Sequence, residues 1–415
     1  MRKKMFYGWW VIMSLMPTNL VHAGALFYVF GVFYRPLLEE FGWTRAEVGG
    51  GLTIFMLTLG LSSPVIGKIT DRFGSRKVII SGALIGGTIF LLLSRIHALW
   101  QFYALYFAHG LAFCACGVVP VITAITNWFE KRRGLATGIA MAGISLGAFT
   151  VTPVGGFVLM HYGWRATYVF LGLLAWILVI PPVLLVARNK PQDMGLLPNG
   201  ADSDSSGSRT SPTSEDGFEE TYVPLNLGQL ARTAPFWFLN IAFFFVYIGI
   251  GSVLGHQIAF LTDMGIPITK AAVALGVTGG IGGLGKISFG LFSDRFSPRR
   301  VAPINFMLQG VGILILLYAK SMPLVWVYAV VFGFSMGGQL ALAPLLIVEF
   351  FGIGSFGTLY GVISLASAIG AAMGPVLGGL AYDLLGSYFN AFLGCVAACV
   401  VASVLIFTAR PRVNA

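Results

Sequence analysis

Long apolar runs separated by short polar stretches make up most of this chain. A helix of about 20 mostly apolar residues spans a bilayer. About twelve such runs are present, at 9–34, 46–69, 77–95, 100–127, 134–160, 165–187, 235–262, 270–293, 301–319, 323–350, 357–382 and 386–409. The pattern predicts an all-α membrane protein in which about twelve transmembrane helices form two pseudo-symmetric six-helix bundles.

A polar stretch from Arg188 to Ala234 divides the apolar runs six and six. We therefore expect an N-terminal bundle at 1–187, a linker at 188–234 and a C-terminal bundle at 235–415. Ser, Asp, Gly and Pro are concentrated at 201–217, which is typical of a disordered linker. No cleavable signal peptide is expected, because the first apolar run continues past Val29 as a full span.

The composition supports a membrane setting. Hydrophobic residues make up 57% of the chain and charged residues 10%, with a mean hydropathy of +0.84. A soluble domain carries about 25% charged residues. So few charges cannot cover a water-facing surface, so a surrounding of low dielectric constant explains the composition best.

The basic residues predict the orientation. Of the 26 lysines and arginines, 19 fall on one side of the predicted spans, 6 on the other, and one, Lys286, inside a span. The positive-inside rule then places both termini and the linker in the cytoplasm of a multi-pass protein of the cell inner (plasma) membrane. Because these residues form short clusters between apolar runs, the net charge of +10 does not indicate nucleic-acid binding.

The four cysteines lie inside apolar runs, at Cys114, Cys116, Cys395 and Cys399. Their spacing resembles a metal pair, but no matching His or Cys set lies nearby, so we interpret them as small packing residues. No metal, no cofactor and no enzymatic activity is expected, because no metal cluster or catalytic triad is evident.

Two loops that lie six spans apart have nearly the same sequence. GKITDRFGSRK occupies 67–77, and GLFSDRFSPRR occupies 290–300. A loop that recurs at this interval indicates internal duplication. Two related six-helix halves around a central cavity are a known design of transporters.

This G-x-x-x-D-R-x-G-x-R-K loop resembles the signature of the major facilitator superfamily. Ser297 stands in the second copy where the family usually has glycine. The resemblance implies that the loop aspartates close the cytoplasmic side, by meeting the N-terminus of a neighbouring helix and loop arginines. It therefore assigns gating roles to Asp71, Arg72, Asp294 and Arg295; for the second copy, charges that only fix the topology are the alternative.

A narrower resemblance lies at 128–143, with the sequence WFEKRRGLATGIAMAG. It closely follows the Y-F-x-K-R-R-x-L-A-x-G-x-A-x-A-G pattern of monocarboxylate transporters, with Trp128 in place of the opening tyrosine. Bacterial oxalate–formate antiporters share much of this pattern. The small residues of the motif also permit close helix contact, so a structural role is the alternative.

Lys286 lies inside the eighth run, in GGLGKISFG at 282–290. A charge in the middle of a membrane costs about 2.5–3.5 kcal/mol on insertion scales, and it usually faces a cavity. The alternative is a lysine that extends toward the cytoplasmic surface. The resemblance implies that Lys286 replaces the arginine that pairs with the substrate carboxylate, although lysine lacks the planar two-donor fork.

The count of buried charges bears on the substrate. No Asp or Glu is found at the middle of a span, so one monoanion would neutralise Lys286. The resemblance implies that oxalate–formate antiporters hold a dianion with a second lysine, and Ser367 takes that position here. One cation favours a monocarboxylate.

Further candidates for substrate binding are Tyr28, Gln339, Ser364 and Ser367, which offer polar groups inside spans. Packing contacts between helices are the alternative for each. Candidates for proton coupling are Lys286, His22, His109 and His256. For each histidine, a hydrogen-bonded packing role is the alternative.

The sequence therefore suggests a secondary active transporter of small monocarboxylates such as lactate or pyruvate, coupled to protons by symport and working by alternating access. Expected partners are the anion, a proton and the lipid bilayer, with a monomeric chain. A carboxylate antiporter of the oxalate–formate type is the alternative. A non-transporting membrane sensor is a further alternative, although no soluble signalling domain is evident.

Overall fold

The computed structural model describes residues 5–23, 30–198, 227–353 and 356–409, and every regular element in these ranges is helical. Ten of the helices are long and apolar enough to cross a membrane. The predicted all-α membrane fold is confirmed, because the apolar runs form helices along the described chain.

The first half contains α1 (Tyr7–Ala23), α2 (Phe30–Phe41), α3 (Arg45–Phe73), α4 (Ser75–Leu93), α5 (Leu99–Cys116), α6 (Val118–Trp128) and α7 (Arg133–Leu185). The predicted spans 134–160 and 165–187 both lie in α7, which is interrupted at Gly163, where φ is 79°. Glycine tolerates this conformation without steric cost. The predicted span 100–127 is divided between α5 and α6 at Gly117.

The second half follows a short 3-10 helix (Pro191–Met194) and α8 (Leu227–Leu230). It contains α9 (Ala234–Asp263), α10 (Ile268–Arg295), α11 (Pro298–Leu317), α12 (Met322–Phe351), α13 (Phe356–Leu385) and α14 (Phe389–Thr408). Each predicted span of this half corresponds to one helix. The stretch that we expect to be a disordered linker, 201–217, lies outside the described residues.

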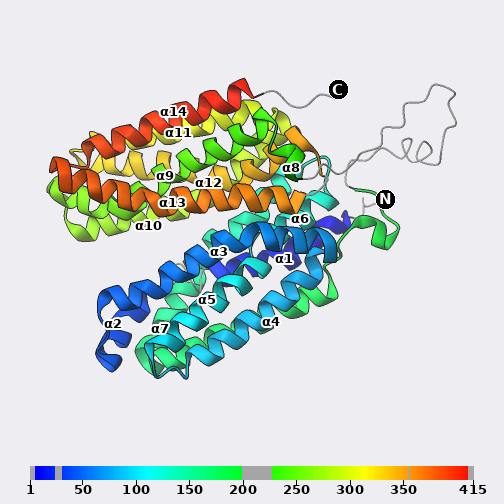
Figure 1. The fold of residues 1–415 in the computed structure, drawn as a ribbon, viewed down its shortest axis with the longest axis horizontal. Coiled ribbons are helices and arrows are strands. Elements are labelled where there is room, and N and C mark those ends of the chain that lie inside the picture. Colours follow the sequence, from blue (N-terminus) through cyan, green and yellow to red (C-terminus); the bar gives the residue numbers. More distant parts are fainter. Residues whose placement is uncertain (1–4, 24–29, 199–226, 354–355, 410–415) are drawn as a thin grey trace.

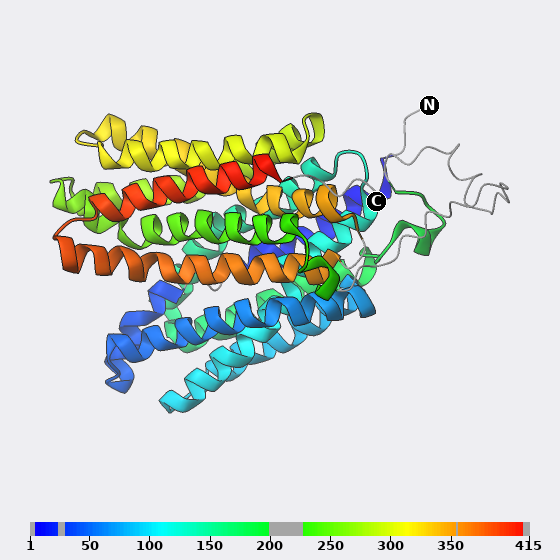
Figure 2. The ribbon, with the colours of Figure 1, turned by 45° about the horizontal axis from the view of Figure 1, so that its top comes forward.

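The helices form two groups, α1–α7 and α9–α14, which lie side by side (Figure 1). Between the groups, α3 packs along α13 and α7 packs along α10. The contact of α3 with α13 is visible in both views (Figure 1, Figure 2). The two groups are closest near the N and C labels and diverge toward the end that carries α2 (Figure 1).

The buried apolar side chains follow the same arrangement. One cluster contains residues of both groups, including Trp128 and Phe243. A second cluster belongs to the first group alone and includes Phe55, and a third belongs to the second group alone and includes Tyr328. The halves therefore share a packed core at one end and have separate cores at the other.

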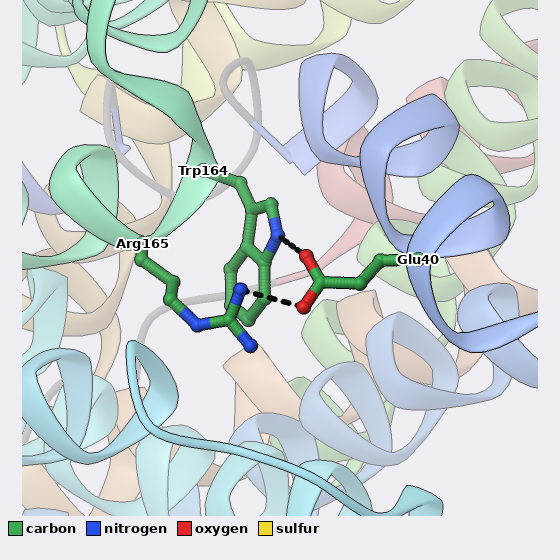
Figure 3. Close-up of polar contacts among 3 residues, drawn as sticks. All are labelled: Glu40, Trp164 and Arg165. Atoms are coloured by element: carbon green, nitrogen blue, oxygen red, sulfur yellow. Dashed lines mark hydrogen bonds and ion pairs between the residues drawn. The ribbon is translucent and has the colours of Figure 1, made fainter.

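Glu40 joins α2 to the part of α7 that follows Gly163 (Figure 3). Its carboxylate accepts a hydrogen bond of 2.6 Å from the Trp164 indole N–H and lies 2.6 Å from Nη1 of Arg165. The Arg165 guanidinium also lies over the Trp164 ring, 4.2 Å from the centroid. The indole hydrogen bond and the neighbouring guanidinium lower the pKa of the Glu40 carboxyl from its ordinary value.

The effect of this contact on stability should depend on pH. A carboxyl whose pKa falls on folding stabilises the folded state above its unfolded-state pKa, and this contribution is lost as the pH falls through the lowered folded-state pKa. Glu40→Gln should therefore lower the thermal unfolding temperature by a similar small amount at pH 7.5 and 5.5. The difference should shrink below about pH 4.3, the ordinary pKa of glutamate.

Thermal unfolding followed by tryptophan fluorescence in detergent would measure this difference. The effect should be small, because the side chains of Arg165 and Glu40 are 43% and 38% exposed and water screens their attraction. Trp164→Phe, which removes the indole donor together with part of the ring beneath Arg165, should give the same pH pattern. Equal unfolding temperatures of all three proteins at pH 7.5 would contradict the stabilising role.

Candidate functional site

Asp71, near the end of α3, binds the first turn of α13. Its carboxylate accepts hydrogen bonds from the backbone N–H groups of Gly357 (2.9 Å) and Thr358 (3.0 Å) and from the Thr358 hydroxyl (2.9 Å). The N-terminus of a helix presents free N–H groups and a positive dipole end, so it favours a carboxylate. This contact joins the first half to the second.

Asp294, near the end of α10, makes the corresponding contact with the first turn of α7. It accepts hydrogen bonds from the backbone N–H groups of Gly134 (2.6 Å) and Leu135 (2.8 Å). We call these two contacts the latches, and the end of the molecule where they lie the latch end. Each latch aspartate belongs to one copy of the repeated loop, so the duplication seen in the sequence recurs as two equivalent contacts.

The two loop arginines do not share the contacts of their neighbouring aspartates in the described structure. The guanidinium of Arg72 lies over the ring of Phe73, 5.3 Å from its centroid. Arg295 lies over Phe296 in the same way, at 5.7 Å. Both arginines are exposed at the latch end.

Below each latch, the halves touch along a line of small residues. We call these lines the α3–α13 seam and the α7–α10 seam. A Cβ added to Gly67 would lie 2.1 Å from the Gly357 carbonyl oxygen, and one added to Gly134 would lie 2.0 Å from that of Gly290. Only glycine allows the two backbones to come this close.

The two seams match level by level. A Cβ on Gly361 would lie 2.4 Å from the Ser63 carbonyl oxygen, and one on Gly138 would lie 2.5 Å from that of Lys286. One level further from the latch end, the contacts are with side chains. A Cβ added to Gly60 would lie 3.0 Å from the Cβ of Ala368, and a Cβ added to Gly283 would lie 3.1 Å from the Cβ of Ser145. In every equivalent pair, the two residues are separated by the same number of positions along the chain. The pairs, each with its α3–α13 member first, are Gly67 and Gly290, Ser63 and Lys286, Gly60 and Gly283, Gly357 and Gly134, Gly361 and Gly138, and Ala368 and Ser145.

Lys286 lies in the α7–α10 seam and is 4% exposed. Its ammonium group donates a hydrogen bond of 2.8 Å to the Ser145 hydroxyl, across the boundary between the halves. Among the described residues, no carboxylate pairs with this ammonium group. The side chain is therefore buried and directed into the protein, and its cationic charge has a neutral partner.

The other candidates for substrate binding have contacts within the second half. Gln339 is fully buried and donates to the side-chain oxygen of Gln309 in α11. The Ser367 hydroxyl donates to the carbonyl of Ile363 in its own helix (2.8 Å), and Ser364 lies beside the Tyr360 hydroxyl. No described hydrogen bond joins these three side chains to Lys286. Tyr28 lies outside the described residues.

The histidines are in different environments. His109 is fully buried, with its ring 4.5 Å from that of Phe90 and 5.7 Å from that of Phe55. His256 is half-buried, and its Nε2 lies 2.7 Å from the Pro375 carbonyl oxygen. These contacts fit packing roles. The side chain of His22 lies outside the described residues.

No group of His, Cys, Asp or Glu in the described parts of the chain could hold a metal ion. The four cysteines are free and buried, as expected for packing residues. Ser145 is the residue that sequence reasoning missed. It lies inside the small-residue stretch of α7, and only the pairing of α7 with α10 reveals its contact with Lys286.

The latches should hold the halves together at the latch end. A hydrogen bond to a charged group contributes about 1.5–3 kcal/mol, so the double variant Asp71→Ala/Asp294→Ala should open this end. Spin labels at Glu130, just before α7, and Arg300, in the first turn of α11, would report the separation of the two halves by pulsed electron resonance, with a shift to longer distances expected. Asp263→Asn, at the opposite end of the helices, serves as the control. An unchanged distance distribution in the double variant would disprove the role of the latches.

Comparisons with known proteins identify the family of this chain. The family model of the Major Facilitator Superfamily matches residues 5–290 and 281–415. Monocarboxylate transporter 13 of Rattus norvegicus is 25% identical over 370 residues, which cover 88% of this chain and 80% of the relative. An uncharacterized MFS-type transporter of Escherichia coli, YhjX, is 25% identical over 352 residues, which cover 83% of this chain and 81% of YhjX.

Two solved structures show the same fold. The E. coli fucose:proton symporter FucP has a TM-score of 0.69 at 16% identity, covering 96% of this chain and 98% of FucP. The human organic anion transporter MFSD10 (TETRAN) has a TM-score of 0.73 at 16% identity, covering 96% of this chain and 99% of that chain. The chain therefore belongs to the Major Facilitator Superfamily and is a membrane transporter, not an enzyme.

Proposed function

We propose that this transporter carries small monocarboxylates such as lactate or pyruvate together with a proton, and that Lys286 binds the anion. One observation carries this proposal: the Lys286 ammonium group is buried and hydrogen-bonded to a neutral hydroxyl. A buried charge without a counter-charge is costly, so the site favours an anion. The relatives named monocarboxylate transporters support this substrate class.

The charge of the site favours a monoanion over a dianion. Lys286 supplies one positive charge, and no described carboxylate offsets it. Ser367 stands where the resemblance to oxalate–formate antiporters expects a second lysine, and its hydroxyl donates within its own helix. A dianion would leave one negative charge uncompensated in a medium of low dielectric constant. The oxalate–formate antiporters hold a dianion, so exchange of carboxylates is the second candidate.

Alternating access would follow from movement of the halves 1–187 and 235–415 as rigid bodies. The contacts between the halves cluster at the latch end, which is closed, and the helices diverge toward the opposite end (Figure 1). Cytoplasmic termini would place the latch end in the cytoplasm. An anion would then reach Lys286 from outside the cell, and opening of the latches would release it inside.

In this proposal, Lys286 alone would suffice for proton coupling. The charged ammonium binds the anion, and together they cross the membrane as a neutral pair. After the anion leaves, loss of the proton removes the cost of returning an uncompensated charge through the low-dielectric core. One carboxylate and one proton would then move in the same direction. The described contacts of His109 and His256 leave them as packing residues in this scheme.

Removal of the cation should abolish binding of the anion. In proteoliposomes, Lys286→Ala and Lys286→Gln should lower uptake of radiolabelled L-lactate at least about 100-fold, because the charged hydrogen bond and the net charge are both lost. Ser63→Ala, at the equivalent position of the α3–α13 seam, is the matched control and should transport normally. Folding would be checked by gel filtration. Normal uptake by folded Lys286→Ala would remove Lys286 from the site.

Proton symport should appear as uptake against a gradient. When the lumen of proteoliposomes is more alkaline than the medium by about one pH unit, one-to-one coupling should accumulate lactate about tenfold above equilibrium. An uncoupler should abolish this accumulation. Exchange of internal for external carboxylate that ignores the pH gradient would instead favour the antiport candidate.

A further inference from the structure

We propose that Ser145 is the second hydrogen-bond donor of the anion site, so that a substrate carboxylate is held between α10 and α7 by Lys286 and Ser145 together. This inference rests on the proposed carboxylate transport and names the residue of the opposite half that recognises the substrate. Neither the repeated loops nor the small-residue motif of α7 points to Ser145.

The comparison of the two seams isolates this pair. The backbones approach each other at the same three levels in both seams, through glycines at equivalent positions. At the two levels further from the latch end, the α3–α13 seam has Ser63 and Ala368, whereas the α7–α10 seam has Lys286 and Ser145. Chemistry suited to an anion therefore occurs in one of two seams that are otherwise built alike. A purely structural role does not require this difference, because the α3–α13 seam packs equally closely without it.

The two side chains together replace the fork of an arginine. Lysine presents a single charged centre, whereas arginine offers two parallel donors that fit both oxygens of a carboxylate. The Lys286 Nζ and the Ser145 Oγ are 2.8 Å apart, which is close enough for the two oxygens of one carboxylate to reach both. A carboxylate can therefore accept one hydrogen bond from each side chain.

The hydrogen-bond inventory permits this exchange without an unpaired group. Nζ has three protons, so it keeps its bond to Ser145 and still donates to the anion. The hydroxyl proton of Ser145 is directed to the Gly279 carbonyl over a long 3.4 Å contact. Turning it to a carboxylate oxygen replaces a weak bond with a charge-assisted one.

Ser145 also lies where a substrate can arrive. The α7–α10 seam is closed at the level of Gly283 and Ser145. Two turns further along α10 from Gly283, a Cβ added to Gly276 would meet nothing within 4 Å. One turn beyond Ser145 on α7, Phe149 is 80% exposed. The pair is therefore at the point where the two helices separate, on the side away from the latch end.

The test is the kinetics of L-lactate uptake in proteoliposomes by the full chain. Ser145→Ala should raise the KM about tenfold, because a hydrogen bond to a charged group is lost, while Vmax changes less than about twofold. Ser145→Thr keeps the hydroxyl and should remain within about twofold of the wild type in KM. Ser145→Cys, with a weak donor of similar size, should give an intermediate KM. Ser63→Ala is the matched control.

A double variant separates recognition of the anion from support of Lys286. In the Lys286→Arg background the guanidinium supplies two donors itself, so Ser145→Ala should raise the KM much less than in the wild type. If Ser145 only positioned the side chain at position 286, Ser145→Ala would raise the KM by the same factor in both backgrounds or would mainly lower Vmax.

Four results would overturn the inference: an unchanged KM in folded Ser145→Ala, equal impairment of the Ala and Thr variants, loss of Vmax alone, or an equal rise in KM on Ser145→Ala in the wild-type and Lys286→Arg backgrounds. These failures leave carboxylate transport intact, provided that the wild type takes up lactate and Lys286→Ala does not. If the wild type takes up no carboxylate at all, the proposed function itself fails, and the role of Ser145 fails with it.

Discussion

The hydrogen bond from the Lys286 ammonium to the Ser145 hydroxyl is the contact on which the proposed function of this transporter depends. A hydroxyl compensates only part of the cost of a buried charge, whereas a carboxylate would compensate most of it. An Asp or Glu in place of Ser145 would stabilise the empty protein and occupy the site permanently. A neutral partner keeps the cation in place and leaves its charge available to a substrate.

Glycine makes this arrangement possible. The ammonium reaches across the boundary between the halves because α7 and α10 approach so closely that a Cβ on Gly138 would meet the Lys286 carbonyl. Duplication provided this geometry twice, since the equivalent contact joins Gly361 and Ser63. The α3–α13 seam packs as closely without a lysine, so the scaffold does not need one. In the proposed mechanism, fold and function are thus separated: the glycines allow the halves to pack closely, and two side chains in one seam would supply the chemistry.

Much of this could be predicted from the sequence, because membrane helices and internal repeats leave local signals. The apolar runs gave the spans, and the repeated loops gave Asp71 and Asp294 as equivalent residues, whose helix N-terminal partners the structure then identified. Lys286 was evident as a charge in an apolar run. Ser145 was not, because a serine in a membrane helix is common and its partner depends on the register of two helices far apart in the chain. For the same reason, the sequence could not show that Gln339 bonds to Gln309.

The seams also show how binding and opening can be connected. The latch contacts join carboxylates to backbone N–H groups and involve no substrate, so their strength is the same in the empty and the loaded protein. Opening the latch end must therefore be compensated by new contacts at the opposite end. A carboxylate held by side chains of both halves would add such a contact at the point where α7 and α10 separate, and it would favour closure of the open side. An anion bound by Lys286 alone would contact one half and would have no such effect, because a ligand shifts a conformational equilibrium only by its difference in affinity for the two states.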